Sequence, residues 1–105
     1  MLTEKDYCDL DTSHELWMMG LEPDTYYDGP IILLYEAQKF LREEKKLHIT
    51  IFSQSQESWQ YRITKPHQRL EDGIHGEDFS SYEEALAEGI KEAVKILKEN
   101  ETIHR

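Results

Sequence analysis

The chain of 105 residues has one cysteine, only 12 basic residues and no long apolar run. The single cysteine, Cys8, excludes an internal disulfide and a zinc site built from several cysteines, as is typical of a reducing compartment. The longest apolar run, residues 31–35, is far too short to cross a bilayer. The first residues lack the basic flank and apolar core of a signal peptide, so we expect a cytoplasmic protein with no membrane partner.

Acidic residues outnumber basic ones by 22 to 12, which gives a formal net charge of −10. Two tryptophans, six tyrosines and three phenylalanines nevertheless supply material for a hydrophobic core, so we expect a folded protein rather than a disordered one. A chain of this length is typical of one domain, and we predict a single small domain over residues 1–105.

The charge is divided into three segments of alternating sign. Residues 1–29 contain eight acidic residues and one basic residue, and residues 71–105 contain ten and four. Residues 30–70 are the reverse, with four acidic and seven basic residues. An acidic surface repels phosphate backbones and attracts basic proteins, so a nucleic-acid contact would have to use the middle segment against the field of the rest.

Two segments in the first half have helical patterns. Thr12 and Glu15 have the spacing of a capping box, and the apolar run after them ends at Gly20. We expect Trp17 and the two methionines that follow it to pack in the core. Pro30 is well placed in the first turn of a second helix, which carries an apolar stripe and continues to residue 44 or 45.

The last segment has the strongest helix signal. Ser81 and Glu84 have capping-box spacing, and the helix that they begin is expected to reach about residue 99. Its apolar face consists of Tyr82, Leu86, Ile90, Ala93 and Leu97. Gly89 lies on this face in mid-helix, where glycine costs about 1 kcal/mol relative to alanine. We therefore expect another backbone to approach closely at Gly89.

Two segments with period-two alternation predict an antiparallel hairpin. Residues 47–53 place Leu47, Ile49 and Ile51 on one face, and residues 59–64 alternate in the same way. An isolated hairpin is marginally stable, so either helices cover its apolar face or a third strand comes from residues 67–79. Both alternatives are open. The predicted fold class is α+β, with helices packed on a small antiparallel sheet in the order helix, helix, strand, strand, optional third strand, helix.

The sequence contains no motif for catalysis. It has no glycine-rich phosphate loop and no serine elbow, and the aspartates around Cys8 disfavour a reactive thiolate. His67 and His75 lie near four acidic residues, but their spacing matches no compact metal site. We therefore expect no enzyme activity, no catalytic residues, no metal and no cofactor.

Two functions are favoured over a third, a small hydrolase or metal protein built on His67, His75 and the nearby acidic residues. The first is an acidic, non-enzymatic accessory protein that binds a basic protein partner or self-associates through an exposed hairpin edge. The second is a nucleic-acid-binding or antitoxin-like regulator that uses the basic middle segment. The candidate binding residues of that segment are Lys39, Arg42, Lys46, Trp59, Arg62 and Lys65.

Several motifs together resemble a family of small uncharacterised bacterial and phage proteins of about one hundred residues. They are Tyr-Glu-Ala-Gln-Lys-Phe-Leu-Arg-Glu at 35–43, Leu-His-Ile at 47–49, Trp-Gln-Tyr at 59–61 and Ser-Tyr-Glu-Glu-Ala-Leu at 81–86. The resemblance covers roughly residues 30–97, and it implies a fold but no activity or catalytic residue. The Ser-Tyr-Glu-Glu-Ala-Leu start is also similar to the helix start of HicB-type antitoxins, and the element order is similar to that of double-stranded-RNA-binding domains.

Overall fold

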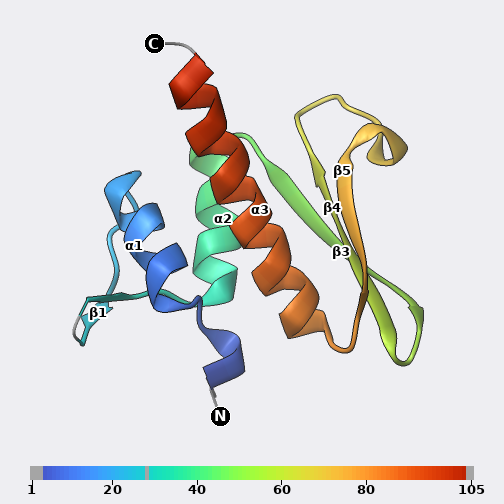
Figure 1. Ribbon diagram of the computed structural model, residues 1–105, viewed down its shortest axis with the longest axis horizontal. Coiled ribbons are helices and arrows are strands. Elements are labelled where there is room, and N and C mark those ends of the chain that lie inside the picture. The colour runs from blue at the N-terminus through green and yellow to red at the C-terminus, as the bar shows by residue number, and fades with distance from the viewer. Residues whose placement is uncertain (1–3, 28, 104–105) are drawn as a thin grey trace.

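The computed structural model describes residues 4–27 and 29–103 of the chain. Within these residues it contains three α-helices and two antiparallel sheets, so the predicted α+β class and element order are confirmed (Figure 1). In chain order the elements are η1 (Glu4–Asp6), α1 (Leu10–Met18), β1 (Thr25–Tyr26), β2 (Pro30–Ile31), α2 (Leu34–Glu44), β3 (His48–Ser55), β4 (Ser58–Thr64), η2 (Leu70–Asp72), β5 (Ile74–Phe79) and α3 (Tyr82–Ile103).

The larger sheet has the strand order β3-β4-β5, and both strand pairs are antiparallel. β3 and β4 form the predicted hairpin, in which Ile49 pairs with Ile63 and Ile51 pairs with Tyr61. Residues that face one another across an antiparallel pair point to the same side of the sheet. These four apolar side chains therefore form one apolar face, as the alternation predicts.

The third strand, β5, lies at the edge of this sheet, and helices also cover the apolar face of the hairpin, so both open alternatives are realised. Ile74 of β5 pairs with Ile63 of β4, and the register shifts near Asp78, whose φ is 69°. A Cβ at Gly76 would lie 2.7 Å from Cζ of Tyr61, so only glycine fits under that ring. An exposed edge strand needs no regular apolar alternation, which is why the pattern left β5 undecided.

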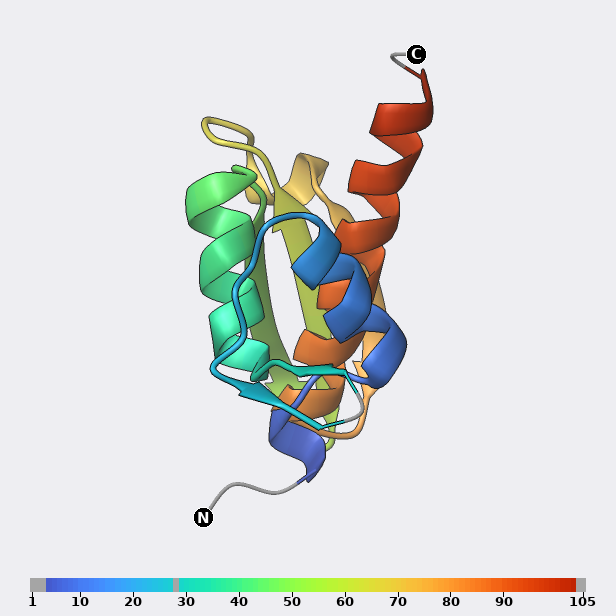
Figure 2. The same cartoon turned by 90° about the vertical axis from the view of Figure 1, so that its left-hand side faces the viewer.

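The three helices lie on the same side of the larger sheet (Figures 1 and 2). α3 crosses the sheet in contact with β3, β4 and β5, and it also contacts α1 and α2. The opposite face of the sheet carries no α-helix among the described elements, and Glu71 of the short 3-10 helix η2 lies against it. This arrangement has two layers, with the apolar core between the helices and the sheet.

The core is made of buried side chains from all three helices and from β3 and β4. Leu16, Leu41, Ile90 and Ala93 are fully enclosed, with 0% exposure. Gly89 also lies in this layer, and a Cβ there would be 3.0 Å from Cγ2 of Ile49. The contact at Gly89 is therefore tight, but the expectation that another backbone makes it is wrong, because the nearest atoms belong to the side chains of Ile49 and Tyr61.

The prediction that Pro30 begins the second helix is wrong. Pro30 lies in β2, where it pairs with Tyr26. The backbone N–H of Cys8 donates to the carbonyl oxygen of Ile32 at 2.9 Å, which keeps the next residues extended as well. α2 consequently begins at Leu34, four residues later, although it ends at Glu44 as predicted. Pairing with a distant segment outweighs the local preference of proline for a helix start.

The predicted cap of α3 is present with one difference. The hydroxyl of Ser81 accepts a hydrogen bond from the backbone N–H of Glu84 at 3.2 Å. The carboxylate of Glu84 reaches back to Ser80, accepting from its hydroxyl at 2.7 Å and from its N–H at 3.2 Å. These bonds to Ser80 lower the pKa of Glu84.

Along the part of the chain that the structure describes, no helix is both long enough and apolar enough to span a membrane.

Candidate functional site

Helix α1 is positioned by a cap that differs from the predicted one. The carboxylate of Asp9, rather than the side chain of Thr12, caps the helix and accepts a hydrogen bond from the backbone N–H of Thr12 at 2.7 Å. Thr12, Ser13 and Leu16 face inward and are buried. The opposite face of α1 is therefore turned to solvent, and its side chains decide what this surface can bind.

The solvent face of α1 and the adjoining strand β1 form an aromatic patch. We use this name for five residues, namely His14, Trp17, Met18, Tyr26 and Tyr27. The tryptophan is 39% exposed, and Met18, Tyr26 and Tyr27 are 70%, 53% and 76% exposed. The expectation that Trp17 and both methionines pack in the core is thus wrong for Trp17 and Met18. Met19 alone packs against the core.

The rings of the aromatic patch contact one another edge to face. The centroid of Trp17 is 5.7 Å from that of His14 and 6.2 Å from that of Tyr26, and both pairs are T-shaped. T-shaped aromatic pairs at these separations are favourable beyond their buried area. Trp17 is therefore held between a helix neighbour and a strand neighbour, which fixes its orientation while leaving its surface exposed.

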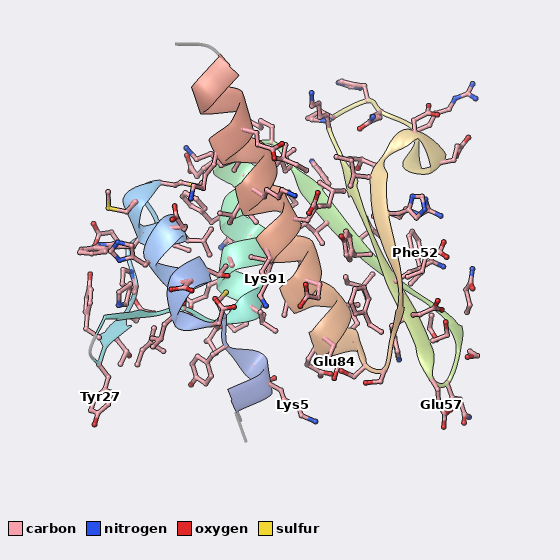
Figure 3. All side chains as sticks on the ribbon, viewed as in Figure 1. Lys5, Tyr27, Phe52, Glu57, Glu84 and Lys91 are labelled. Carbon is pink, nitrogen blue, oxygen red and sulfur yellow. The ribbon has the colours of Figure 1, made fainter. Side chains whose placement is uncertain are left out.

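The short ribbon of β1 and β2 holds the tyrosines in place. Tyr26 pairs with Pro30, and the N–H of Tyr27 donates to the carbonyl oxygen of Gly29 at 2.8 Å. Gly29 has a φ of 140°, a backbone conformation that residues other than glycine rarely adopt. Tyr27 consequently projects from the end of the ribbon, away from the rest of the molecule (Figure 3).

A charged groove of about 810 Å³ runs beside the aromatic patch, between α1 and α3. Asp11, His14 and Glu15 line it from α1, and Lys95 and Lys98 are among the residues that line it from α3. Glu15 and Lys98 form an ion pair across the groove at 3.0 Å. The basic side of the groove is therefore partly neutralised within the protein, whereas the surface nearer the patch remains acidic.

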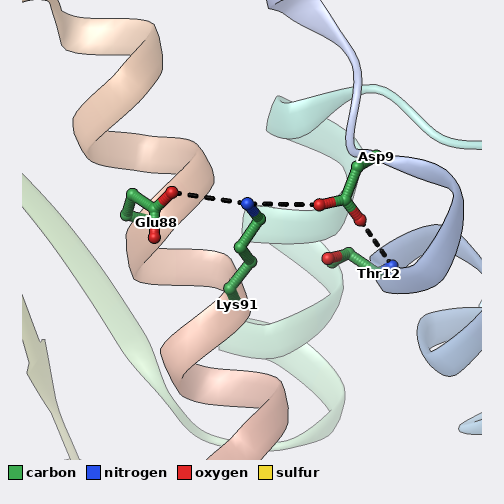
Figure 4. A network of polar contacts seen from close by, with 4 residues as sticks. All are labelled: Asp9, Thr12, Glu88 and Lys91. Atoms are coloured by element: carbon green, nitrogen blue, oxygen red, sulfur yellow. Dashed lines mark hydrogen bonds and ion pairs between the residues drawn. The ribbon is translucent and has the colours of Figure 1, made fainter.

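Asp9, Lys91 and Glu88 form an ionic network that attaches α1 to α3 (Figure 4). Nζ of Lys91 lies 3.2 Å from Asp9 and 3.3 Å from Glu88. Burial raises the pKa of Asp9, but hydrogen bonds from Thr12 and Lys91 outweigh this effect and the pKa is lowered. The hydrogen bond to Asp9 raises the pKa of Lys91. Both shifts favour the charged pair.

The pKa shifts in this network predict a pH-dependent attachment of α1. The contribution of Asp9 to the free energy of unfolding is complete above its pKa in the unfolded chain, about 3.9. It is lost as the pH falls through the lower pKa of the folded protein. The contribution of Lys91 to the free energy of unfolding is complete below its pKa in the unfolded chain, about 10.4, and is lost as the pH rises through its higher folded pKa. We expect Asp9→Asn, which keeps a capping oxygen but no charge, to reduce stability at neutral pH by about 0.2–1 kcal/mol.

The measurement is the melting temperature as a function of pH from neutral into acid. The variant should lose less stability than the wild type on acidification, because its side chain has no proton to take up. Asp11→Asn is the matched control, since Asp11 is an exposed neighbour on the same helix. Identical acid profiles for Asp9→Asn and Asp11→Asn would contradict the role given to the network.

The six candidate residues of the basic middle segment lie on different surfaces. Four are exposed on α2 or directly beyond α2 and β4, namely Lys39, Arg42, Lys46 and Lys65. Trp59 lies on the helix side of β4, where its ring centroid is 5.8 Å from that of Tyr82. Arg62 is three residues further along the strand and therefore points to the opposite face of the sheet. Trp59 and Arg62 do not serve one common ligand in this geometry.

One edge of the hairpin considered for self-association is occupied, and the other, along β3, is an edge of the sheet. β5 pairs along β4, and Nε2 of Gln38 in α2 donates to the carbonyl oxygen of Ile49 in β3 at 2.8 Å. On β5 itself the bulge at Asp78 and the neighbouring Glu77 interrupt the edge. Charges and bulges on edge strands are typical devices against strand addition.

The features considered for catalysis or metal binding give no assembled site. Burial, and secondarily the charge of Asp9, raises the pKa of Cys8 to about 12, so its thiol is protonated at neutral pH. Within residues 4–27 and 29–103, no group of three or more histidine, cysteine, aspartate or glutamate side chains is arranged to hold a metal ion. His75 lies 3.9 Å from Glu77, and both side chains are about half exposed.

No protein-family model matches this chain, and no curated protein or solved structure matches it either. The structure therefore defines a class, an α+β protein in which, within the described residues, α2 and α3 pack on one face of a three-stranded antiparallel sheet and α1 packs on α3. The family resemblance drawn from the sequence motifs stays a prediction. A functional assignment has to be argued from the surfaces of the molecule itself.

Proposed function

We propose that this protein is a non-enzymatic accessory protein of the cytoplasm, of bacterial or phage origin, that binds a basic protein partner through the aromatic patch. The observation that carries the proposal is the ring contact of the exposed side chains Trp17 and Tyr26, with Met18 and Tyr27 exposed at the neighbouring positions of the chain. Tryptophan and tyrosine dominate the binding energy of protein interfaces, and methionine is enriched there. A contiguous exposed apolar surface is typical of an interaction site.

The charge around the aromatic patch supports a basic partner. Residues 1–29 carry eight acidic residues and one basic residue, and Asp11, Glu22 and Asp24 of this segment are exposed. A basic partner is attracted by this field, and its association slows as salt rises. A second copy of the chain, also at −10, is repelled by it. Charge thus favours a different protein over self-association.

The test is capture of the partner by the purified, tagged protein from cells of its source, with nuclease treatment throughout. We expect one basic protein to be retained, and the purified pair to bind with an affinity that falls as salt is added. The double variant Trp17→Ala/Tyr27→Ala should weaken this binding by about 30-fold or more, because truncation of an interface hot spot costs about 2 kcal/mol.

Tyr35→Ala provides the matched control. Tyr35 is 62% exposed and lies on α2 rather than on the aromatic patch, so this variant should bind as the wild type does. Equal losses in the control and in the patch variant would contradict the proposed surface. Recovery of nucleic acid, or of partners that nuclease removes, would instead favour the basic middle segment.

A further inference from the structure

A hollow of about 360 Å³ lies on the face of the larger sheet opposite α2 and α3, and none of its lining residues belongs to the aromatic patch. Its lining residues are Phe52 and Gln54 of β3, Gln60 and Arg62 of β4, and Glu71 of η2. Phe52 pairs with Gln60 in the sheet register, so their side chains stand side by side on this face. Because side chains alternate along a strand, Ile51 and Tyr61 lie under the helices, and Phe52 and Gln60 lie on the opposite face of the sheet.

Gln60 is the most unusual residue of the hollow. It is only 6% exposed, yet its Oε1 is buried with no hydrogen-bond partner among the residues that the structure describes. A buried acceptor without a donor is costly, and most such groups in folded proteins are paired. A ligand that offers an N–H to Oε1 of Gln60 would remove this cost once the side-chain amide turns toward the hollow that Gln60 lines, so the hollow is suited to a hydrogen-bond donor.

The other side chains define the remaining chemistry of the ligand. Phe52 is half-buried and offers an aromatic surface beside Gln60. Arg62 is also half-buried, and no ion pair to its guanidinium is found in the described part of the chain. Its cross-strand neighbours are Thr50 and His75, neither of which is a carboxylate. The face therefore combines a stacking surface, an unsatisfied acceptor and an available cation.

We propose that this hollow binds a mononucleotide. The base stacks on Phe52 and donates from its amino group to Oε1 of Gln60, and the phosphate pairs with Arg62. Glu71 can only accept hydrogen bonds when ionised, so it also suits an amino group rather than the phosphate. A volume of about 360 Å³ is at the small end of ligand pockets, which fits one nucleotide.

The net charge of the protein decides between a single nucleotide and a nucleic-acid strand. The protein has a net charge of −10, so it repels a nucleic-acid strand that extends from the hollow. Binding of such a strand also depends on several phosphate contacts. The hollow offers one arginine, and Trp59 is directed to the other face. One phosphate is therefore matched by the site, whereas a row of phosphates is not.

The test is a nuclear magnetic resonance titration of the full-length, ¹⁵N-labelled protein with AMP, CMP, GMP and UMP in turn. We expect saturable shifts centred on the backbone amides of Phe52, Gln60 and Arg62. AMP, CMP and GMP should bind more tightly than UMP, whose base has no exocyclic amino group. No shifts at millimolar nucleotide, or shifts confined to the helices, would overturn the proposal.

Variants separate the contributions of base and phosphate. Arg62→Gln should weaken AMP binding by about tenfold or more but leave adenosine binding nearly unchanged, because only the phosphate contact is lost. Gln60→Leu should weaken both ligands and remove the preference over UMP. Lys95→Gln, which also removes one exposed positive charge but on α3, is the control and should bind as the wild type does.

Two further probes test the choice of ligand. Inorganic phosphate alone should bind far more weakly than AMP, and equal affinities would show anion binding only and overturn the proposal. A short oligouridine that bound more tightly than every mononucleotide would overturn it in favour of a strand. Trp17→Ala/Tyr27→Ala should bind AMP like the wild type, so failure of the nucleotide site and failure of the protein-binding surface are distinguishable.

Discussion

Replacing Ile90 with alanine is expected to lower the free energy of unfolding by about 2–5 kcal/mol. Ile90 has 0% exposure and belongs to the core cluster together with Leu41, Ile49 and Ile63, which come from α2, β3 and β4. Its side chain thus fills the centre of the layer between α3 and the sheet. The loss combines the transfer free energy of the removed carbons with the cavity that remains.

The matched control is Ile74→Ala, which deletes the same atoms at an edge-strand position that is 46% exposed. We expect this change to cost about 1 kcal/mol or less, because much of the side chain is already in water. Urea unfolding followed by circular dichroism measures both variants. Equal losses would mean that the layer between α3 and the sheet is not the main core of the protein.

Replacing Gly89 with valine is expected to lower the free energy of unfolding by about 1–3 kcal/mol, the usual cost of overpacking a core. A Cβ at this position would lie 3.0 Å from Cγ2 of Ile49 and 3.2 Å from Cγ of Tyr61. The branched side chain adds two further carbons in the same space. α3 therefore has to move away from the sheet, although removing a mid-helix glycine by itself favours the helix.

Lys95→Val separates the packing effect from the helix propensity of valine. Lys95 is exposed on the same helix, so this substitution introduces the same branched side chain without contact to the sheet. Its expected effect is below about 1 kcal/mol. The packing argument fails if thermal or urea unfolding shows Gly89→Val to be as stable as the wild type or more so.

Gly89→Val also bears on the two proposed surfaces in different ways. Tyr61, which the new side chain would displace, lies between Gln60 and Arg62 on β4, and these two residues line the hollow on the opposite face. The aromatic patch is carried by α1 and β1 at some distance along the chain. The patch is nevertheless linked to α3 in space, because Lys91 and Glu88, which flank Gly89, attach α1 to α3 through Asp9.

The local pattern of the sequence determined the hairpin and the last helix. Alternation of Ile49 and Ile51 with polar residues set which face of β3 is buried, and the spacing of Leu86 and Ile90 set the buried face of α3. These signals are local because one face of each element is apolar and the other is not. Gly89 was identifiable for the same reason, as a residue without a side chain on an apolar face.

Contacts between distant segments decided the start of α2, the strand β5 and the exposure of α1. The backbone N–H of Cys8 bonds to the carbonyl oxygen of Ile32 just before α2, and β5 is held by its pairing with β4. α1 has apolar residues on both faces, so the pattern could not tell that Leu16 is enclosed and Trp17 exposed. Only the packing of Leu16 against the rest of the molecule settles that orientation.

The sequence by itself thus determined the fold class, the two strands of the hairpin and the apolar face of α3, because each depends on periodicity within segments. The tertiary structure decided which residues are available for binding. The aromatic patch joins α1 to β1, and the hollow joins β3, β4 and η2, so both arise from segments brought together by folding. Surface position depends on what the rest of the chain covers, and no local pattern contains that information.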